Sequence, residues 1–276
     1  MRISVVTPNF NAAPYLEDTI KSVIANLRVG DEYFVVDGGS ADGSVDIIRR
    51  HESAITGWVS EKDAGYADAL AKGFARATGD ILCWLNSSDL YLSGTLDRVR
   101  TILAGQSDLI FGDDFNIDES NRVVFFGRGW VPDLRLGTLY GGWTPLQESC
   151  FWRRDLYEKV GGIDPSLNYA ADYDLFLRMS AVARTTYVPL AFSAFRRHSG
   201  QKSISGMLAY QSERWACRAR ELRRQVEPKG LNLLKRVAYR SAMSARARLA
   251  PWLWSRPDLA GIDVGTLPCA QYWPKT

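Results

Sequence analysis

The sequence predicts an α/β protein with a mostly parallel central sheet flanked by helices, followed by a helical C-terminal extension. In residues 1–115, short apolar runs rich in β-branched residues alternate with segments of helical periodicity, a pattern typical of parallel βαβ units. The apolar runs are nearly continuous, as expected for strands that are covered on both faces. From about residue 213 the composition becomes strongly basic, and this change marks the extension.

The individual elements follow from this alternation. Leu16, Ile20 and Val23 repeat at helical spacing behind Pro14, a residue type that suits a helix start because its missing N–H would have no partner there. The predicted strands are 2–8, 32–38, 55–60, 80–86 and 108–113. The predicted helices are 14–26, 43–51, 65–78 and 93–104.

The pattern becomes more mixed after residue 115. The elements predicted here are an antiparallel strand at 122–130, a loop or lid at 137–142 before Trp143, a strand and a helix within 148–164, a helix at 169–184, and a closing strand at 186–198. We therefore divide the chain into a domain of residues 1–205, with halves 1–115 and 116–205, and a basic helical extension of residues 206–276.

Composition and charge exclude several classes of protein. With 46% hydrophobic and 24% charged residues, the chain is typical of soluble globular proteins, and a net charge of +3 does not indicate a nucleic-acid partner. No stretch approaches the roughly 18 apolar residues that span a bilayer, and the N-terminus lacks a signal-peptide pattern. The cysteines are too widely spaced for a zinc site or a disulfide framework, which favours a reducing, cytoplasmic location. They are Cys83, Cys150, Cys217 and Cys269.

Polar segments follow the first four strands, at the edge where parallel sheets bind ligands. These segments are TPNFN (7–11), DGGSADGS (37–44), SEKDAGYAD (60–68) and NSSD (86–89). Asp37 suits either a bond to a ribose or base, or an Asx turn, and the residues alone favour neither. Lys72 suits either a phosphate or an ion pair with Asp68, four residues earlier. Asp89 suits a divalent cation shared with a diphosphate, but its spacing alone favours a helix cap.

Two further positions could carry chemistry. Asp172 and Asp174 are two residues apart and therefore project in different directions from a helix, so that one can cap the helix while the other faces a cleft as a general base. His198 suits Mn²⁺, although a surface role is more common for an isolated histidine in a basic loop. The sequence lacks G-x-G-x-x-G after its first strand, a P-loop and a G-x-S-x-G elbow, which argues against dehydrogenases, P-loop kinases and α/β-hydrolases.

Taken in order, these segments resemble the family 2 glycosyltransferases, which have a Rossmann-like nucleotide-diphospho-sugar transferase fold. The matching segments are SVVTPNFNAAPYLEDTIKSV, EYFVVDGGSADGSVDII, WVSEKDAGYADALAKGFARATGDILCWLNSSD, QESCFWRRDLYEKVGGID, DYDLFLR and FRRHSGQKS. They span residues 2–203, and their order and spacing make the resemblance specific. It implies a catalytic domain in which residues 1–115 bind the nucleotide-sugar and residues 116–205 bind the acceptor.

The resemblance also implies residue roles. Asp172 would be the base that deprotonates the acceptor hydroxyl, and Asp89, with His198, would hold a divalent metal, Mn²⁺ or Mg²⁺, at the diphosphate. Phe10 would pack on the base and Asp37 would bond to the base or ribose. The other residues implied at the nucleotide-sugar are Thr7, Pro8, Asn11, Asp63, Gly65, Asp68, Lys72 and Ser88. For the acceptor we predict Trp143, Gln147 and Glu148.

The implied reaction is an inverting transfer of a sugar from a nucleotide-diphosphate donor, for which we expect a UDP-sugar, to a glycan or lipid-linked saccharide. A single base with in-line displacement gives inversion. The chain departs from the family at Asn86-Ser87-Ser88-Asp89, where two or three acids are usual, and at Ala171, where Glu is common. A catalytically inactive nucleotide-sugar-binding protein therefore stays open, whereas a nucleotidyltransferase is disfavoured because TPNFNAAP is not a Gly-rich basic loop.

The basic extension admits two interpretations. A cationic amphipathic helix with tryptophan suits an anionic membrane surface, which would make the protein peripheral on the inner face of the cell membrane. The alternative is a solvated face packed on the catalytic domain, or a contact in a homodimer.

Overall fold

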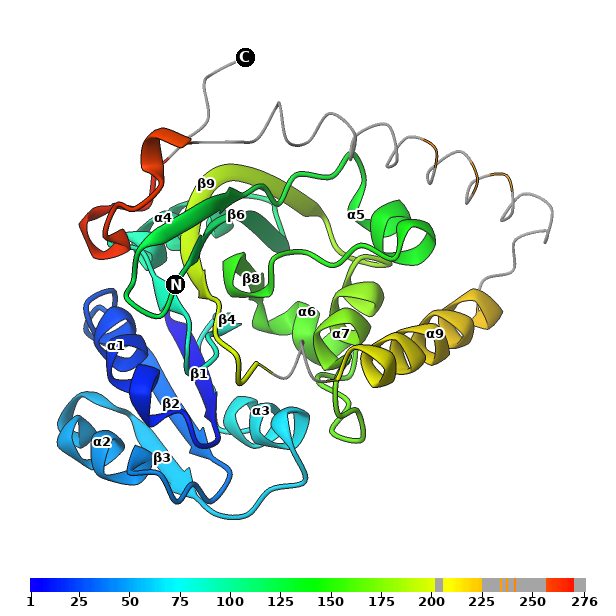
Figure 1. Ribbon diagram of the computed structural model, residues 1–276. Coiled ribbons are helices and arrows are strands. Elements are labelled where there is room, and N and C mark those ends of the chain that lie inside the picture. The colour runs from blue at the N-terminus through cyan, green and yellow to red at the C-terminus, as the bar shows by residue number, and fades with distance from the viewer. Residues whose placement is uncertain (202–205, 225–233, 235–236, 238–240, 242–256, 271–276) are drawn as a thin grey trace.

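The computed structural model describes residues 1–201, 206–224, 234, 237, 241 and 257–270 (Figure 1). Its strands are β1 (Ile3–Asn9), β2 (Glu32–Asp37), β3 (Gly57–Ser60), β4 (Ile81–Trp84), β5 (Leu90–Tyr91), β6 (Leu109–Ile117), β7 (Val123–Gly127), β8 (Cys150–Arg153) and β9 (Thr185–Arg196). Its α-helices are α1 (Ala13–Ile24), α2 (Ser44–Arg50), α3 (Tyr66–Phe74), α4 (Thr95–Leu103), α5 (Leu134–Leu136), α6 (Arg154–Lys159), α7 (Ala171–Met179) and α9 (Met207–Arg224). Shorter turns of helix are η1 (Glu52–Ala54), η2 (Gly137–Gly141), η3 (Gln147–Ser149), η4 (Pro257–Leu259) and η5 (Val264–Thr266).

The described strands form one sheet in the order β3-β2-β1-β4-β8-β6-β9-β5, with β7 added beside β6. Strands β3, β2, β1 and β4 pair in parallel, and so do β6 and β9, whereas β8 runs antiparallel between β4 and β6. The predicted α/β class is therefore confirmed, and the sheet is mixed, because β5 also pairs antiparallel with β9 and β7 with β6. The insertion of β8 separates the fourth and fifth predicted strands, which the order of the chain does not reveal.

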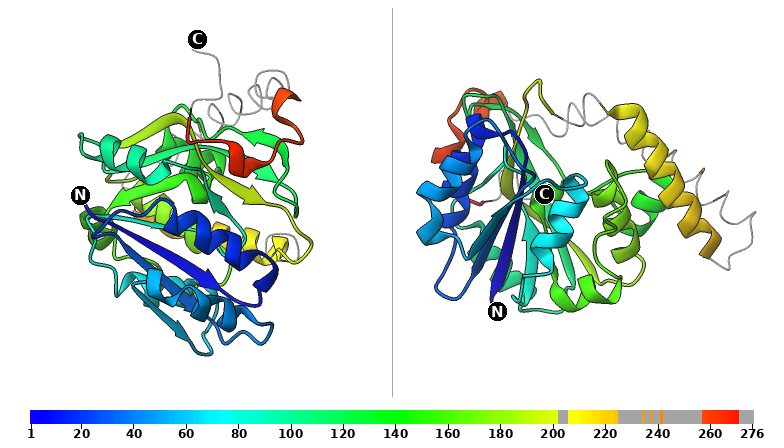
Figure 2. Two further views of the ribbon diagram at one scale, coloured as in Figure 1. Left: turned by 90° about the vertical axis from the view of Figure 1, so that its left-hand side faces the viewer. Right: turned by 90° about the horizontal axis from the view of Figure 1, so that it is seen from below.

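Helices cover both faces of the sheet (Figure 2). On one face, Leu16 and Ile20 of α1 pack with Val5 of β1 in a cluster that also takes in α2 and α4. On the other face, Leu70 of α3 and Phe176 of α7 belong to a second cluster that contains tryptophans of β4 and β8. Both faces are thus apolar, as the continuous apolar runs in the sequence predict.

Several element boundaries differ from the predictions. The helix predicted at 65–78 ends at Phe74, because the chain must then turn close to β1, where the Gly79 N–H donates to Ser4 Oγ at 2.8 Å. A Cβ at Gly79 would lie 2.6 Å from that hydroxyl, so only glycine fits there. The helix predicted at 169–184 is the shorter α7, and the loop predicted at 137–142 contains the π-helical turn η2.

The described part of the C-terminal region consists mainly of helix α9 and of a segment, residues 257–270, that packs against the sheet. The long helix α9 confirms a helical extension, while the basic segments 233–240, apart from residues 234 and 237, and 244–256 lie outside the described residues. Residues 257–270 return to the sheet, where Val123 N donates to Ile262 O at 2.9 Å and Cys269 N donates to Ser93 O at 2.8 Å. The side chains of Leu259 and Cys269 join the core cluster that α1 covers.

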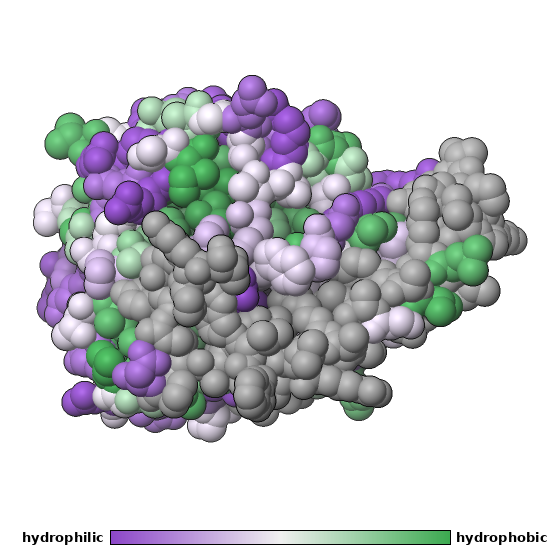
Figure 3. Space-filling model, turned by 90° about the horizontal axis from the view of Figure 1, so that it is seen from above, coloured by the Kyte–Doolittle hydropathy of each residue, from purple (hydrophilic) through white to green (hydrophobic). Residues whose placement is uncertain are grey.

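The surface of the described residues is mixed in character. In Figure 3, hydrophobic residues on the visible face form separate groups among hydrophilic ones. No helix within the described ranges is both long and apolar enough to cross a membrane.

Candidate functional site

The carboxyl ends of β1, β2 and β3 lie side by side and bring polar side chains together around Asp37. Asn9 is opposite Asp37 in the β1–β2 pair, and Ser60 is opposite Asp37 in the β2–β3 pair. The Asp37 carboxylate accepts hydrogen bonds from Asn9 Nδ2 and Ser60 Oγ, each at 2.6 Å. It also accepts from the hydroxyl and the backbone N–H of Ser40 and from the backbone N–H of Gly39.

These donors keep Asp37 ionised although its side chain has no exposed surface. Burial by itself would raise the pKa of Asp37, but the hydrogen bonds from Ser40, Ser60 and Asn9 outweigh it and leave the pKa below its ordinary value. The Asx turn predicted as one alternative is present. A bond from Asp37 to a base or ribose stays a prediction, and it would require a nucleotide to replace one of these donors.

The first loop offers an exposed aromatic ring at the same edge. Phe10 is 64% exposed, and Asn11, which has a φ of 49°, accepts a hydrogen bond from Ala41 N at 3.0 Å. Thr7, by contrast, is fully buried inside β1 and accepts a hydrogen bond from a tyrosine hydroxyl, and Pro8 is also buried in that strand. Phe10 and Asn11 therefore have exposed surface that could contact a nucleotide, whereas Thr7 and Pro8 are buried.

The loop after β3 packs against the loop after β2. Asp63 accepts a hydrogen bond from Gly65 N at 2.9 Å, and its Oδ2 lies 2.7 Å from the place where a Cβ would stand on Gly38. Lys72 Nζ lies 2.9 Å from Glu61 Oε1 and 3.2 Å from Asp68 Oδ2. The ion pair predicted for Asp68 and Lys72 is thus present, and a contact of Lys72 with phosphate stays a prediction.

Asp89 lies in the turn between β4 and β5 and has no exposed surface. Its Oδ1 accepts a hydrogen bond from the backbone N–H of Arg196 at 3.1 Å, and its Oδ2 accepts one from Asn86 Nδ2 at 3.2 Å. Burial, and then the charge of Glu148, raises the pKa of Asp89 well above its ordinary value. The N-cap residue of α4 is Gly94, so the interpretation of Asp89 as a helix cap is wrong.

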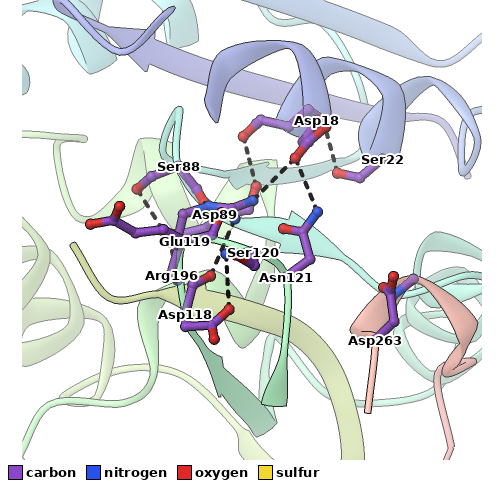
Figure 4. A network of polar contacts seen from close by, with 12 residues as sticks. Asp18, Ser22, Ser88, Asp89, Asp118, Glu119, Ser120, Asn121, Arg196 and Asp263 are labelled. Carbon is purple, nitrogen blue, oxygen red and sulfur yellow. Dashed lines mark hydrogen bonds and ion pairs between the residues drawn. The ribbon is translucent and has the colours of Figure 1, made fainter. Parts of the chain in front are cut away.

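Arg196 anchors this turn from the end of β9. Its side chain is fully buried, and its Nε donates to the carbonyl oxygen of Ser88 at 2.9 Å. The guanidinium also donates to the carbonyl oxygens of Asp118 and Glu119 and pairs with Asp18 Oδ2 at 3.5 Å. Figure 4 shows Arg196 between α1, the turn after β4 and the turn between β6 and β7. One buried cation therefore holds three segments together beside the predicted metal ligand.

His198 lies against α1 and also faces an open cavity. Its ring centroid is 4.8 Å from that of Tyr15, and burial lowers the pKa of His198. The cavity has a volume of about 790 Å³ and is lined by Glu119, Phe195, Arg197, His198, Ser199, Gln201 and Met207. In the part of the chain that the structure describes, no group of three or more His, Cys, Asp or Glu side chains is arranged to hold a metal ion. A metal here would depend on oxygen ligands from the substrate.

A pair of buried carboxyl groups lies near Asp89. Asp114 of β6 and Glu148 of η3 are 1% and 5% exposed and are hydrogen-bonded to each other. Burial raises the pKa of Asp114 to about 7 and that of Glu148 well above its ordinary value. The charge of Asp172 contributes to the shift at Glu148. The structure therefore places the predicted metal ligand, the predicted base and Glu148 in one electrostatic neighbourhood.

The segment before β8 connects this centre to β4. Gln147 Oε1 accepts a hydrogen bond from Asn86 Nδ2 at 3.0 Å, and Gln147 Nε2 donates to the carbonyl oxygen of Trp84 at 2.9 Å. Trp143 packs on Phe111 with ring centroids 6.0 Å apart. Gln147 and Glu148 thus form a wall of the site, whereas their contact with an acceptor stays a prediction.

Asp172 and Asp174 have different environments, as their spacing predicts. Asp174 is fully buried and pairs with the guanidinium groups of Arg178 and Arg220, which makes it a structural carboxylate. Asp172 keeps part of its surface accessible and accepts a hydrogen bond from Tyr173 N at 2.7 Å. The surrounding protein raises the pKa of Asp172 to about 6 through burial.

A second, smaller cavity lies beside Tyr173, the residue that follows Asp172. It has a volume of about 170 Å³ and is lined by Gly141, Gly142, Tyr173, Gln211, Arg214, Trp215 and Arg218. The charge of Arg214 lowers the pKa of Asp172 and so partly opposes the effect of burial. Helix α9, which the sequence assigns to the extension, therefore borders the predicted base.

The sequence-based reasoning missed some residues of the site, among them Asp114 and Arg196. Asp114 follows the predicted strand 108–113, so the strand-end rule applied to the first four strands would also have found it. No local pattern singles out Arg196, because its partners come from three segments remote in sequence.

Comparisons with known proteins agree with this architecture. A model of the family described as "Glycosyl transferase family 2" matches residues 4–132. An uncharacterized glycosyltransferase of Mycobacterium tuberculosis (strain ATCC 25618 / H37Rv) is 32% identical over 198 residues, covering 70% of this chain and 74% of the relative. A PGL/p-HBAD biosynthesis glycosyltransferase of Mycobacterium bovis (strain BCG / Pasteur 1173P2) is 28% identical over 206 residues, covering 71% and 77%.

Solved structures share the fold. Residues 1–349 of S. aureus TarS in complex with UDP-GlcNAc have a TM-score of 0.70 at 15% identity, covering 91% of this chain and 76% of that one. The mannosyltransferase PcManGT from Pyrobaculum calidifontis, in complex with GDP-Man and Mn²⁺, has a TM-score of 0.62 at 19% identity, covering 93% and 76%. The family match and the identity to the mycobacterial relative establish that this chain belongs to the family 2 glycosyltransferases.

Proposed function

We propose that this glycosyltransferase moves a sugar from a nucleoside-diphosphate donor, for which we expect a UDP-sugar, to a hydroxyl of a glycan or lipid-linked saccharide with inversion of configuration. The observation that carries the proposal is the contrast at the start of α7. Asp174 is neutralised by two arginines, whereas Asp172 has a raised pKa of about 6 and a partly accessible side chain, and the next residue, Tyr173, lines a cavity. A carboxylate with a pKa slightly below neutral suits a general base that works near pH 7.

The chemistry at Asp172 follows from its charge state. Above pH 6 the carboxylate is ionised and can accept the proton of an acceptor hydroxyl as that oxygen attacks the anomeric carbon. The nucleoside diphosphate leaves from the opposite side, which inverts the anomeric configuration. Neither step requires a second carboxylate in contact with the sugar.

The residues around Asp89 fit a divalent cation that takes only a few of its ligands from the protein. Asp89 is a buried carboxylate, and Asn86 Oδ1 is a buried oxygen with no hydrogen-bond partner among the described residues. Hard cations prefer such oxygen ligands and commonly complete their shell with phosphate oxygens and water. When bound, a cation would stabilise the negative charge that develops on the departing diphosphate. His198 is the further ligand that the sequence resemblance implies.

Two similarities support the donor class. The TarS structure contains UDP-GlcNAc and the PcManGT structure contains GDP-Man with Mn²⁺. In this chain, the exposed ring of Phe10 lies at the carboxyl end of β1 and is available to stack on a base. For the acceptor, we propose the region of Trp143, Gln147 and Glu148, which contacts the turn of Asp89 through Asn86.

A membrane-associated acceptor is a further part of the proposal. Helix α9 carries Leu208 and Trp215, which are 88% and 55% exposed, together with basic residues at its C-terminal end. Such a helix suits the surface of an anionic bilayer. Flotation with liposomes that contain anionic lipid tests this point, and a failure to bind them would remove membrane-surface association from the proposal. Association as a homodimer is tested separately by the molar mass in solution.

A two-stage experiment tests the function. First, thermal shift with UDP-, GDP- and dTDP-sugars, with and without Mn²⁺, identifies the donor that stabilises the protein most. Second, release of the nucleoside diphosphate is measured for wild type and Asp172→Asn. Donor-dependent stabilisation without any turnover in wild type would favour the alternative of an inactive binding protein, and a product of retained anomeric configuration by NMR would overturn the inverting mechanism.

A further inference from the structure

The segment that leads into α7 is held by a residue of α9 and has no cap of its own. The N-cap residue of α7 is Ala170, which has no side-chain acceptor. The carboxylate of Glu213 instead accepts hydrogen bonds from the backbone N–H groups of Asn168 at 3.0 Å, Tyr169 at 2.8 Å and Ala170 at 2.8 Å. A negative charge at this end of a helix is also favoured by the helix dipole.

These contacts fix the backbone immediately before the predicted base. Asp172 follows Ala170 by two residues, so the position of its carboxylate depends on where the three anchored peptide groups lie. The neighbouring Arg214 places its guanidinium 4.7 Å from the centroid of the Tyr173 ring, and its charge acts on Asp172. Helix α9 thus contacts the backbone before Asp172 and the ring after it.

The same segment touches the donor side of the site. A Cβ added at Gly65 would lie 3.2 Å from Asn168 Oδ1, so Asn168 lies directly beside the loop after β3. The segment before α7 is therefore held between α9 on one side and a loop predicted to bind the nucleotide-sugar on the other. A shift of this segment would change the distance between the base and the donor.

We propose that Glu213 of α9 is a positioning residue for Asp172. The inference rests on the proposed function, because it assumes that Asp172 is the general base. Misplacement of a catalytic group by about 1 Å can cost roughly a hundredfold in rate. Loss of the Glu213 carboxylate should therefore reduce turnover much more than it reduces donor binding.

The test compares Glu213→Gln with Glu221→Gln. Glu221 lies on the same helix and pairs with Arg135 at 2.7 Å, so its substitution weakens the docking of α9 without touching the segment before α7. The assay is hydrolysis of the best-bound UDP-sugar in the presence of Mn²⁺. We expect kcat to fall about 10- to 100-fold in Glu213→Gln with the donor KM within about twofold of wild type, and kcat to stay within about threefold in Glu221→Gln.

A double-mutant comparison separates this inference from the proposed function. If Glu213 acts through Asp172, Glu213→Gln adds little further loss in an Asp172→Asn background. Full activity of Asp172→Asn would overturn the proposed function itself. A slow Asp172→Asn together with wild-type kcat in Glu213→Gln, or equal losses in Glu213→Gln and Glu221→Gln, would overturn the positioning role alone.

A measurement without turnover provides a second test. The carboxyl carbon of Asp172 is titrated by NMR, with Asp172→Asn used to assign its resonance. We expect a pKa near 6 in wild type and in Glu221→Gln, and a lower pKa in Glu213→Gln because a loosened segment admits water to the carboxylate. Identical titration curves in wild type and Glu213→Gln would contradict the inference.

Discussion

Two buried carboxylates, Asp37 and Asp114, lie on the same sheet in opposite electrostatic states. Asp37 receives hydrogen bonds from the loop after β2, from Ser60 at the end of β3 and from Asn9, and its pKa lies below the ordinary value. Asp114 is hydrogen-bonded to another acid, Glu148, and burial raises its pKa to about 7. Burial penalises the charged form in both places, so the supply of donors decides which carboxylate stays ionised.

The comparison distinguishes two regions. In the first, around Asp37, the protein supplies the donors that an ionised carboxylate needs, and in the second, around Asp114, it does not. Around Asp37, the loop after β2 and the end of β3 satisfy the carboxylate with neutral donors. Around Asp114, the charges of Asp113 and Asp89 add to burial in raising the pKa, and the hydrogen-bond partner Glu148 is itself an acid. Protons, a cation or substrate hydroxyls would be stabilised in the second region and have no comparable role in the first.

The largest expected effect belongs to Asp172, which borders the second region. Asp172→Asn should lower the rate of donor hydrolysis or sugar transfer by about 10³-fold, because the amide cannot accept a proton. Donor binding measured by thermal shift should be unchanged. A loss of less than about tenfold would remove Asp172 from the role of base.

The pH profile sharpens the same prediction. The folded pKa of Asp172 is about 6, so kcat/KM of wild type should rise about tenfold per pH unit below this value and level off above it. The rising limb should be missing from the residual activity of Asp172→Asn. A wild-type profile that is flat from pH 5 to pH 8 would contradict this assignment.

The next effect concerns the stability of the region around Asp37. Asp37→Ala leaves the buried donors of Asn9, Ser40 and Ser60 without their acceptor and should lower the free energy of unfolding by about 3 kcal/mol. Urea unfolding measures the change. Asp46→Ala is the control, because the Asp46 side chain is 73% exposed and its loss should change stability by less than about 0.5 kcal/mol.

A smaller effect is expected at the turn of Asp89. Arg196→Lys keeps the charge but cannot reproduce the set of bonds that the guanidinium makes to three carbonyl oxygens. The Mn²⁺ concentration for half-maximal donor hydrolysis should rise about tenfold. Arg197→Lys on the neighbouring residue, which bonds to Asn116 instead, should leave this concentration unchanged. Equal effects in both variants would show that Arg196 has no specific role in holding Asp89.

The smallest effect should have the opposite sign from that at Asp37. The folded pKa of Asp114 is raised to about 7, so between about pH 4 and pH 7 the native state keeps a proton that the unfolded chain has already released. The stability that comes from holding this proton is present at low pH and is lost as the pH rises through 7. Asp114→Asn should therefore stabilise the protein at pH 8 by about 1 kcal/mol and have little effect at pH 5. Urea unfolding at both pH values tests this, and a lower stability of Asp114→Asn than of wild type at pH 8 would contradict the raised pKa of Asp114.

The sequence by itself determines the alternation of strands and helices and the position of the ligand-binding edge. The apolar runs at 2–8, 32–38 and 80–86 correspond to β1, β2 and β4, and the polar residues that follow them lie at the carboxyl ends of those strands. Hydrophobic periodicity reports whether a segment is covered on one face or both, and this is a local property. The ends of the predicted strands single out Asp37 and Asp89, whereas Asp172 follows from the spacing of two acids at the start of a helix and from the family resemblance.

Only the tertiary structure decides how these carboxylates behave. Asp89 owes its hydrogen bond to Arg196, which is 107 residues away, and the segment before α7 owes its anchor to Glu213, more than forty residues later. Strand β8, inserted between β4 and β6, brings Glu148 to Asp114. Charge state and position depend on burial and on donors in space, and a pattern along the chain carries no information about which distant segments supply them.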